Sequence, residues 1–179
     1  MSRNVLQSGR FIAVQFIALI AATMMGCASY SGSGLVPGQS SVDDVVAVMG
    51  EPALIRDAPR GAPQGEKIYW YPRLPMARES FAARIDAHGT LIAIEQRLAP
   101  QYISQIIPNK STSDDVLDIL GPPYRIYPYP RMQREAWEYQ LRTPPTYMNL
   151  YVQVSPDHVV REVFQLLDRE QEEFFFPFR

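Results

Sequence analysis

A stretch of sixteen residues occurs twice in this chain, and it constrains the fold more than any other feature. Pro37–Pro52 reads PGQSSVDDVVAVMGEP, and Pro108–Pro123 reads PNKSTSDDVLDILGPP. The identical positions, given by their numbers in the first copy, are Pro37, Ser40, Asp43, Asp44, Val45, Gly50 and Pro52. An internal repeat of this kind indicates that one supersecondary unit is built twice.

The first half of each copy carries the signals of a helix start. Ser41 or Ser40 can accept a hydrogen bond from the free N–H groups of a first helical turn, and Asp44 follows Ser41 by three residues, as in a capping box. The second copy repeats this with Thr112 or Ser111 and with Asp115. The pairs Asp43-Asp44 and Asp114-Asp115 are also conceivable as acid–base or cation-binding carboxylates. Adjacent helical residues do not face each other, so capping is the favoured interpretation.

The second half of each copy predicts that the helix ends abruptly. Gly50 and Gly121 can take the left-handed conformation that closes a helix, and Pro52 and Pro123 prevent its continuation. Between start and end, an apolar stripe predicts one buried face. Its members are Val45, Val46, Val48 and Met49 in the first copy and Val116, Leu117, Ile119 and Leu120 in the second.

Alternation of apolar and polar residues predicts three strands after each helix. These strands are expected over residues 67–71, 81–86 and 91–96, and over 135–141, 148–154 and 159–167. Tyr102, Ile103, Ile106 and Ile107 indicate a short helix before Pro108. The predicted class is therefore α+β. It consists of two tandem units, each a helix or helix pair plus a three-stranded antiparallel meander, with shared or abutting sheets.

The N-terminus has the pattern of a secretory signal. Arg3 and Arg10 precede an apolar run over residues 11–25, which is shorter than the roughly 20 residues of a spanning helix. Met24, Met25, Gly26 and Cys27 then resemble the lipobox of bacterial lipoproteins, which implies that Cys27 is acylated. Ala28 after the cysteine resembles cargo sorted to the outer membrane. We therefore expect a signal peptide over 1–26, an acylated cysteine and flexible tether over 27–35, repeats over 36–98 and 99–170, and an aromatic tail over 171–179.

Composition excludes several classes. The chain has 17 basic and 19 acidic residues and a net charge of −2, so it lacks the basic footprint of a nucleic-acid-binding protein. With Cys27 as the single cysteine, no disulfide can form within the chain. No nucleophile elbow, phosphate loop or dinucleotide fingerprint occurs. We therefore expect no catalysis, no cofactor and no small-molecule substrate.

His88 and His158 fall in equivalent hairpin turns and are expected to be solvated rather than metal-binding.

Aromatic residues are the candidates for a recognition surface, because Tyr and Trp are enriched at interface centres. The candidates on strands are Tyr69, Tyr71, Trp137 and Tyr139. Burial beneath the helices is an equally weighted interpretation, since one face of each strand must supply the core. The tail adds Phe174, Phe175, Phe176 and Phe178, which either fold back on the sheet or bind a partner or membrane.

The order of these motifs resembles the BamE family of outer-membrane lipoproteins, also called SmpA or OmlA. The run ISQIIPNKSTSDDVLDILGPP, then AWEYQL and YVQVSPDHVVREV, follows the family order, and Pro37–Pro52, YWY and ARIDAHGTLIAIEQ follow it again. The chain departs from the family in having Asn109 in place of a glycine, no clear first helix in the first copy, and two copies. Two tandem copies are also similar to the β-lactamase inhibitory protein fold, in which joined sheets form one concave surface.

The resemblance implies a non-enzymatic lipoprotein of the outer membrane that faces the periplasm. Its expected partners are components of the β-barrel assembly machinery, which it would bind as a scaffold, and the lipid bilayer through its anchor. The alternative is an inhibitor or adaptor that docks an envelope enzyme on a concave β-sheet. Fold alone does not choose between them.

Overall fold

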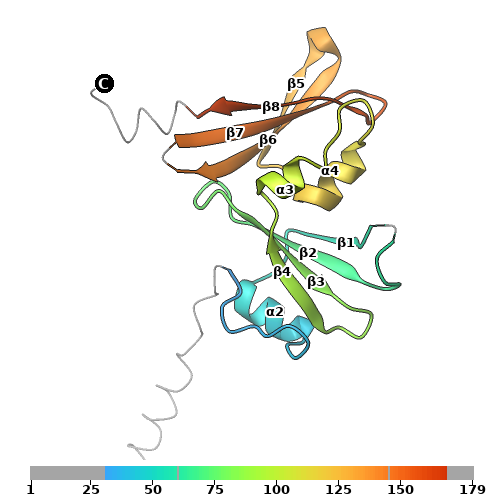
Figure 1. The fold of residues 1–179 in the computed structure, drawn as a ribbon, viewed down its shortest axis with the longest axis vertical. Coiled ribbons are helices and arrows are strands. Elements are labelled where there is room, and N and C mark those ends of the chain that lie inside the picture. Colours follow the sequence, from blue (N-terminus) through green and yellow to red (C-terminus); the bar gives the residue numbers. More distant parts are fainter. Residues whose placement is uncertain (1–30, 60, 145, 169–179) are drawn as a thin grey trace, which may run out of the picture.

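The chain forms an elongated stack of four layers, seen in a computed structural model that describes residues 31–168 except 60 and 145 (Figure 1). A helix at one end is followed by a four-stranded sheet, then by two helices, and then by a second four-stranded sheet. All strand pairs are antiparallel. The helices precede each group of four strands and do not alternate with single strands. The expected α+β class is confirmed.

The first half of the described chain contains α2 and the first sheet. Helix α2 spans Val42–Met49. The sheet has the order β1-β2-β3-β4. Its strands are β1 (Leu54–Asp57), β2 (Lys67–Pro72), β3 (Ser80–Ile85) and β4 (Leu91–Gln96).

The second half contains two helices and the second sheet. The helices are α3 (Pro100–Ile103) and α4 (Ser113–Leu120). The sheet has the order β5-β6-β7-β8. Its strands are β5 (Arg125–Tyr129), β6 (Arg134–Thr143), β7 (Thr146–Val154) and β8 (Val160–Leu167), and a short 3₁₀ helix, η1 (Pro130–Met132), joins β5 to β6. No helix among the described residues is long and apolar enough to cross a membrane.

Both repeats begin their helices with a complete capping box. Ser41 Oγ accepts a hydrogen bond from the Asp44 N–H at 3.2 Å, and the Asp44 carboxylate accepts one from the Ser41 N–H at 2.8 Å. Thr112 and Asp115 repeat this geometry at 3.2 and 2.7 Å. Each box satisfies N–H groups that a helix start leaves free. The capping interpretation is confirmed, with Ser41 and Thr112 as the capping residues.

The first sheet is covered on both faces. Helix α2 packs Val45 and Met49 against one face, where Tyr71 and Leu91 are also fully buried. The opposite face presents Ile68, Trp70 and Ala82, all of which are buried as well. A strand with both faces covered has apolar residues at successive positions, and the run Ile68 to Tyr71 has this pattern.

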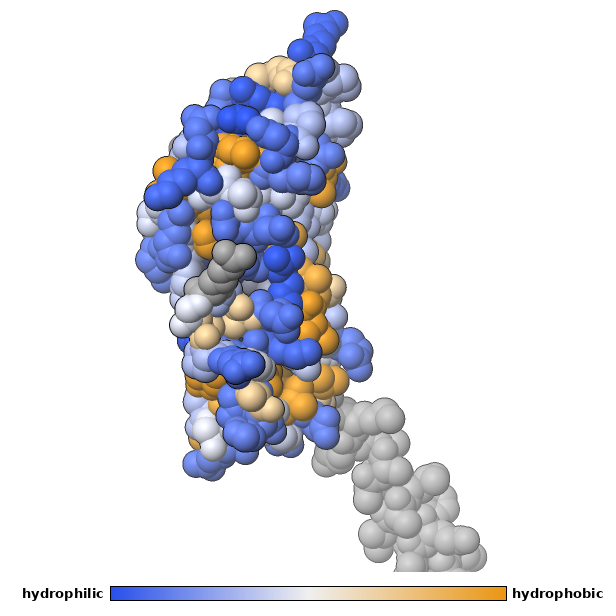
Figure 2. Space-filling view, turned by 90° about the vertical axis from the view of Figure 1, so that its right-hand side faces the viewer, coloured by the Kyte–Doolittle hydropathy of each residue, from blue (hydrophilic) through white to orange (hydrophobic). Residues whose placement is uncertain are grey.

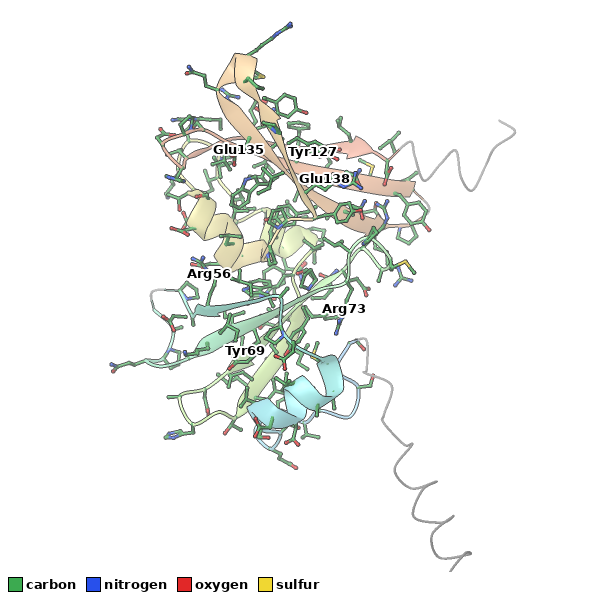
Figure 3. The ribbon with its side chains drawn as sticks, turned by 180° about the vertical axis from the view of Figure 1, so that it is seen from behind. Arg56, Tyr69, Arg73, Tyr127, Glu135 and Glu138 are labelled. Carbon is green, nitrogen blue, oxygen red and sulfur yellow. The ribbon has the colours of Figure 1, made fainter. Side chains whose placement is uncertain are left out.

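The helices of the second repeat provide the cover on that opposite face. The Trp70 ring lies against Gly121 at the end of α4, where a Cβ would come within 2.3 Å of Trp70 Cε3. Arg56 of β1 donates a hydrogen bond of 2.6 Å from Nε to the Asp118 carboxylate on α4. Figure 3 shows Arg56 on the side of the first sheet that faces α4. Ser80 donates its hydroxyl to the Leu120 carbonyl at 3.3 Å. Helices α3 and α4 are therefore sandwiched between the two sheets.

The second core lies between these helices and one face of the second sheet. Val116 and Leu120 of α4 pack there with Tyr139 and Leu150, all with no exposed surface. The Tyr139 hydroxyl donates a hydrogen bond of 2.9 Å to the Gly121 carbonyl, which ties β6 to the end of α4. The same helix end is thus fixed by Trp70 from one sheet and by Tyr139 from the other.

Two details of the expected organisation are wrong. The units are not three-stranded, because β1 and β5 each add a strand: Leu54 pairs with Trp70, and Arg125 pairs with Glu138. The sheets are also separate, because α3 and α4 lie between them. The expected helix-plus-three-stranded units with joined sheets are therefore incorrect in strand number and in sheet arrangement.

The expected tether also ends earlier than residue 35. Gly32 is buried, and a Cβ there would come within 2.5 Å of Ile94 Cδ1. Leu35 packs against the core beneath α2. The chain is therefore part of the folded body from Gly32 onward. Cys27 and the signal segment lie outside the described residues.

Candidate functional site: the open face of the second sheet

Among the described residues, no helix lies on one face of the second sheet. Trp137, Tyr139 and Leu141 of β6 point toward α4, so Glu138 and Gln140 point the other way. Glu138 has Arg125 of β5 and Tyr151 of β7 as its direct cross-strand neighbours. We call this surface the open face; Figure 3 shows Tyr127 and Glu138 on it.

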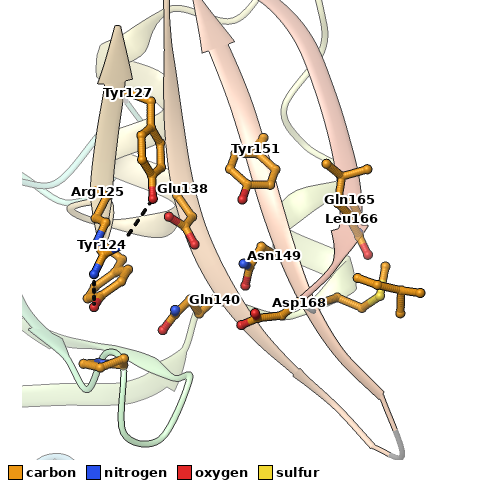
Figure 4. A pocket seen from close by; sticks show the side chains of 13 residues that line it. Tyr124, Arg125, Tyr127, Glu138, Gln140, Asn149, Tyr151, Gln165, Leu166 and Asp168 are labelled. Carbon is orange, nitrogen blue, oxygen red and sulfur yellow. Dashed lines mark hydrogen bonds between the residues drawn. The ribbon is translucent and has the colours of Figure 1, made fainter. Parts of the chain in front are cut away.

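A hollow of about 770 Å³ lies on the open face (Figure 4). Its wall is formed by side chains of all four strands and by Tyr124, which precedes β5. Those used in the argument below are Tyr124, Arg125, Tyr127, Glu138, Gln140 and Tyr151. Aromatic rings beside a few convergent polar groups are typical of a binding site rather than of an unused surface.

Glu138 is the most unusual residue of the hollow. It is 4% exposed, and its Oε2 atom has no hydrogen-bond partner among the described residues. Gln140 lies two residues further along the same strand, is 8% exposed, and has an unpartnered Oε1 atom. Buried polar atoms are normally paired, since leaving one unpaired costs about 1–3 kcal/mol. Two acceptors without a partner among the described residues therefore lie on the same face of one strand.

The cationic cross-strand neighbour of Glu138, Arg125, is bonded to other groups. The Arg125 guanidinium donates hydrogen bonds to the hydroxyls of Tyr124 at 3.1 Å and Tyr127 at 3.4 Å, and it stacks over the Tyr124 ring. These contacts raise the pKa of Arg125, and the hydrogen bond to Tyr127 is the largest cause. Within the described residues, no ion pair joins Glu138 to a cation. Figure 4 shows Arg125 turned toward Tyr124 and away from Glu138.

Tyr151 is affected by the same carboxylate. Burial raises the pKa of its phenol, and the negative charge of Glu138 raises it further. The ring stacks on Phe164 of β8 with 5.5 Å between ring centroids. Tyr151 therefore stays neutral and is held as an aromatic wall beside Glu138.

The far end of the hollow is closed by a buried ion pair. Arg78, from the β2–β3 loop of the first half, donates to the Asp168 carboxylate, and both side chains are almost fully buried. Arg78 also stacks over the Tyr147 ring at 4.7 Å and reaches the Asn149 side chain at 3.4 Å. Asp168 is thus paired with a cation of the first half, whereas Glu138 has no ion pair among the described residues.

The repeat explains why only one such face exists in the described chain. Tyr69-Trp70-Tyr71 corresponds to Trp137-Glu138-Tyr139, so Trp70 and Glu138 hold equivalent positions. Their cross-strand neighbours correspond too: Leu54 and Ala82 in the first sheet match Arg125 and Tyr151 in the second. In the first sheet this set packs under α4. In the second it lines the hollow.

Most of the aromatic candidates from the sequence lie elsewhere. Tyr71, Trp137 and Tyr139 are buried in the cores, at 1%, 9% and 0% exposure. Tyr69 is half-buried at the edge of the core beneath α2. The structure thus places these rings as the core interpretation expects. Phe174, Phe175, Phe176 and Phe178 lie outside the described residues.

Trp137 also lines a second, smaller hollow of about 420 Å³. Pro128, Pro130 and Pro156 form much of its wall, together with His158 at its rim. Within the described chain, no cluster of three or more His, Cys, Asp or Glu side chains could hold a metal ion.

Sequence reasoning missed Glu138, Gln140 and Tyr151. A signal was present in the repeat itself, because an apolar Trp70 in one copy aligns with a charged Glu138 in the other. Such an exchange indicates that one copy of this surface is covered and the other is not.

Figure 2 shows another side of the molecule, on which apolar surface gathers more in the lower half, around the first sheet and α2.

Comparisons with known proteins are sparse. A scan against models of known protein families finds no match, and a search of curated proteins finds none either. Among solved structures, the chain is similar to a DUF4309 family protein, YjgB, from Bacillus subtilis. The two share 20% identity over 76% of this chain and 84% of the other, with a TM-score of 0.30. A likeness this weak carries no argument about function.

Proposed function

We propose that this protein is a non-enzymatic, lipid-anchored binding module of the bacterial envelope that holds a protein partner on its open face. The observation that carries the proposal is the pair of buried, unpartnered acceptors of Glu138 and Gln140 in the wall of a hollow. Natural folds pair the large majority of such atoms, so two unpaired acceptors in one hollow call for an explanation. A ligand that supplies donors would complete the site.

The partner class comes from the resemblance to the BamE family. We propose components of the outer-membrane β-barrel assembly machinery, with the protein acting as a scaffold. Acylation of Cys27 would keep it at the membrane, where a tethered module meets its partner at a raised effective concentration. The layered fold supports this role, since the helices between the sheets fix the open face relative to the rest of the body.

A second candidate is an inhibitor or adaptor that docks an envelope enzyme. The observation that favours it is the concavity itself, because a hollow of about 770 Å³ on a sheet can receive a protruding loop. The joined concave surface of the β-lactamase inhibitory protein fold is not available for this, because the two sheets are separate. An inhibitor or adaptor of this kind would therefore dock the enzyme in the hollow on the second sheet alone.

Affinity capture from mildly solubilised membranes tests the proposal. The full-length protein is compared with a Cys27→Ser form, a Tyr127→Ala form and a Tyr129→Ala form, and the captured proteins are identified by mass. Tyr127 lines the hollow, whereas the neighbouring Tyr129 of the same strand is 43% exposed outside it. Tyr127→Ala should lose the partner and Tyr129→Ala should keep it.

The identity of the captured proteins separates the two candidates. Barrel-assembly components support the scaffold, and a single envelope hydrolase supports the inhibitor. Capture by Tyr127→Ala that equals capture by the unchanged protein would exclude the hollow as the binding surface. Cys27→Ser protein that still carries lipid and fractionates with membranes would contradict the anchor.

A further inference from the structure

The charge of Glu138 indicates what kind of group the hollow accepts. A buried carboxylate is costly unless a cation or several donors compensate it. Glu138 is 4% exposed, its Oε2 has no partner, and no cation among the described residues is paired with it. A neutral hydroxyl would supply a hydrogen bond but leave the charge uncompensated. The chemistry therefore favours a positively charged donor.

Gln140 adds a second acceptor at a defined place. Residues i and i+2 of a strand point to the same face, and their Cα atoms are about 7 Å apart. Gln140 and Glu138 both line the hollow, and each has a side-chain oxygen without a hydrogen-bond partner among the described residues. A ligand with several donors in one rigid group can bond to both side chains, whereas a single-donor ligand bonds to one.

The aromatic walls favour a planar cation. Tyr127 and Tyr151 flank Glu138 on the neighbouring strands, and Tyr124 stands at the rim (Figure 4). Cations bind over the faces of such rings, and guanidinium groups do so more often than ammonium groups. The protein already shows this chemistry nearby, since Arg125 stacks over Tyr124 at 4.7 Å.

We propose that the hollow binds a guanidinium group, the side chain of an arginine in the partner, through Glu138 and Gln140 between the rings of Tyr127 and Tyr151. A guanidinium is planar, carries five N–H donors, is weakly hydrated, and stays charged at all relevant pH values. It matches a carboxylate, a second acceptor and aromatic walls together. This inference rests on the proposed binding role of the open face and names the group recognised there.

Calorimetric titration of the detergent-solubilised full chain tests the inference. The probes are N-acetyl-arginine-N′-methylamide, its citrulline counterpart, which has nearly the same shape without the charge, and agmatine. The arginine probe should bind with saturation and at least ten times more tightly than the citrulline probe. Equal binding of the two, or no binding of the arginine probe, would overturn the guanidinium assignment.

Matched variants locate the binding. Glu138→Gln should weaken the arginine probe at least tenfold, whereas Glu162→Gln should leave it unchanged. Glu162 lies on β8 with its side chain 53% exposed and is already paired with Arg134. An unchanged affinity in Glu138→Gln would remove Glu138 from the site. Tighter binding of agmatine than of the arginine probe would assign the hollow to a small free guanidinium cation and overturn the partner side chain.

A second measurement keeps the result independent of folding. Removing an uncompensated buried charge should raise the thermal midpoint of the ligand-free Glu138→Gln protein above that of the wild type. A lowered midpoint would mark Glu138 as a structural residue and contradict the inference. Partner capture that survives in Glu138→Gln would reject the guanidinium contact while leaving the binding role intact. Binding of the arginine probe without any partner capture would support the guanidinium contact and reject the proposed binding role.

Discussion

The indole ring of Trp70 lies directly against Gly121, the residue that ends α4. Gly121 has a φ of 79°, and a Cβ there would come within 2.3 Å of Trp70 Cε3. Its repeat equivalent Gly50 has a φ of 86° but nothing within 4 Å of the Cβ position. The two glycines thus share a backbone requirement, and only Gly121 has a steric one.

Alanine at these two positions separates the requirements. Gly50→Ala should cost about 1–3 kcal/mol of unfolding free energy, because an L residue is strained at this φ. Gly121→Ala should cost a further 1–3 kcal/mol or so, because the methyl group overlaps a ring that cannot move. Denaturant unfolding of both variants measures the difference. Equal losses would mean that α4 does not pack against the first sheet as described.

Tyr71 and Tyr139 hold equivalent positions in the two repeats, yet their hydroxyl groups differ. The Tyr139 hydroxyl donates to the Gly121 carbonyl at 2.9 Å, whereas the buried Tyr71 hydroxyl has no hydrogen-bond partner in the described chain. Tyr139→Phe should therefore cost about 1 kcal/mol, since a buried acceptor loses its donor. Tyr71→Phe should be neutral or slightly stabilising. Chemical denaturation decides, and a larger loss in Tyr71→Phe would contradict the assigned contacts.

Tyr71 also predicts a dependence on alkaline pH. Burial, followed by the nearby Glu51 charge, raises its pKa to about 12, whereas an unfolded tyrosine ionises near about pH 10. A raised folded-state pKa means that the contribution to stability is complete below about pH 10 and is lost as pH rises toward 12. Tyr71→Phe should therefore lose less stability than the wild type between about pH 10 and 11.5. Parallel unfolding curves at pH 9 and 11 measure this, and identical losses would contradict the predicted shift.

The helices could be predicted from sequence because their signals are local. Ser41 with Asp44, and Thr112 with Asp115, are capping boxes that lie within four residues of each other and need no tertiary contact. Strand β4 also has the bounds expected from its alternation. Local hydrogen bonds and side-chain periodicity were sufficient for these elements.

The arrangement of the layers could not be predicted in the same way. The burial of Trp70 depends on Gly121, fifty-one positions further along the chain, and the short segments that become β1 and β5 have weak periodicity of their own. The aromatic residues expected to form a recognition surface are large and apolar, and such residues are the ones that a hydrophobic core buries. The open face was instead marked by a polar residue, Glu138, at a position where the other repeat has tryptophan.

Arg78 and Asp168 offer the sharpest test of how the two halves are joined. Arg78 reaches from the β2–β3 loop to Asp168 after β8, and the side chains are 5% and 7% exposed. Removing one partner of a buried ion pair costs about 3–5 kcal/mol, because the remaining group loses the attraction that offset its burial. We therefore expect Arg78→Met to lower the free energy of unfolding by about that amount.

The exposed pair of Arg142 and Glu79 provides the matched control. The Arg142 side chain is 62% exposed and 3.4 Å from the carboxylate, so Arg142→Met should cost less than about 1 kcal/mol. Adding Asp168→Asn to Arg78→Met should recover part of the lost stability, because the negative charge that Arg78 offset is then removed as well. Urea denaturation of the four proteins measures these differences. If the double variant were less stable than Arg78→Met alone, Arg78 would be acting through its packing on Tyr147 and its hydrogen bond to Asn149 rather than through the charge of Asp168.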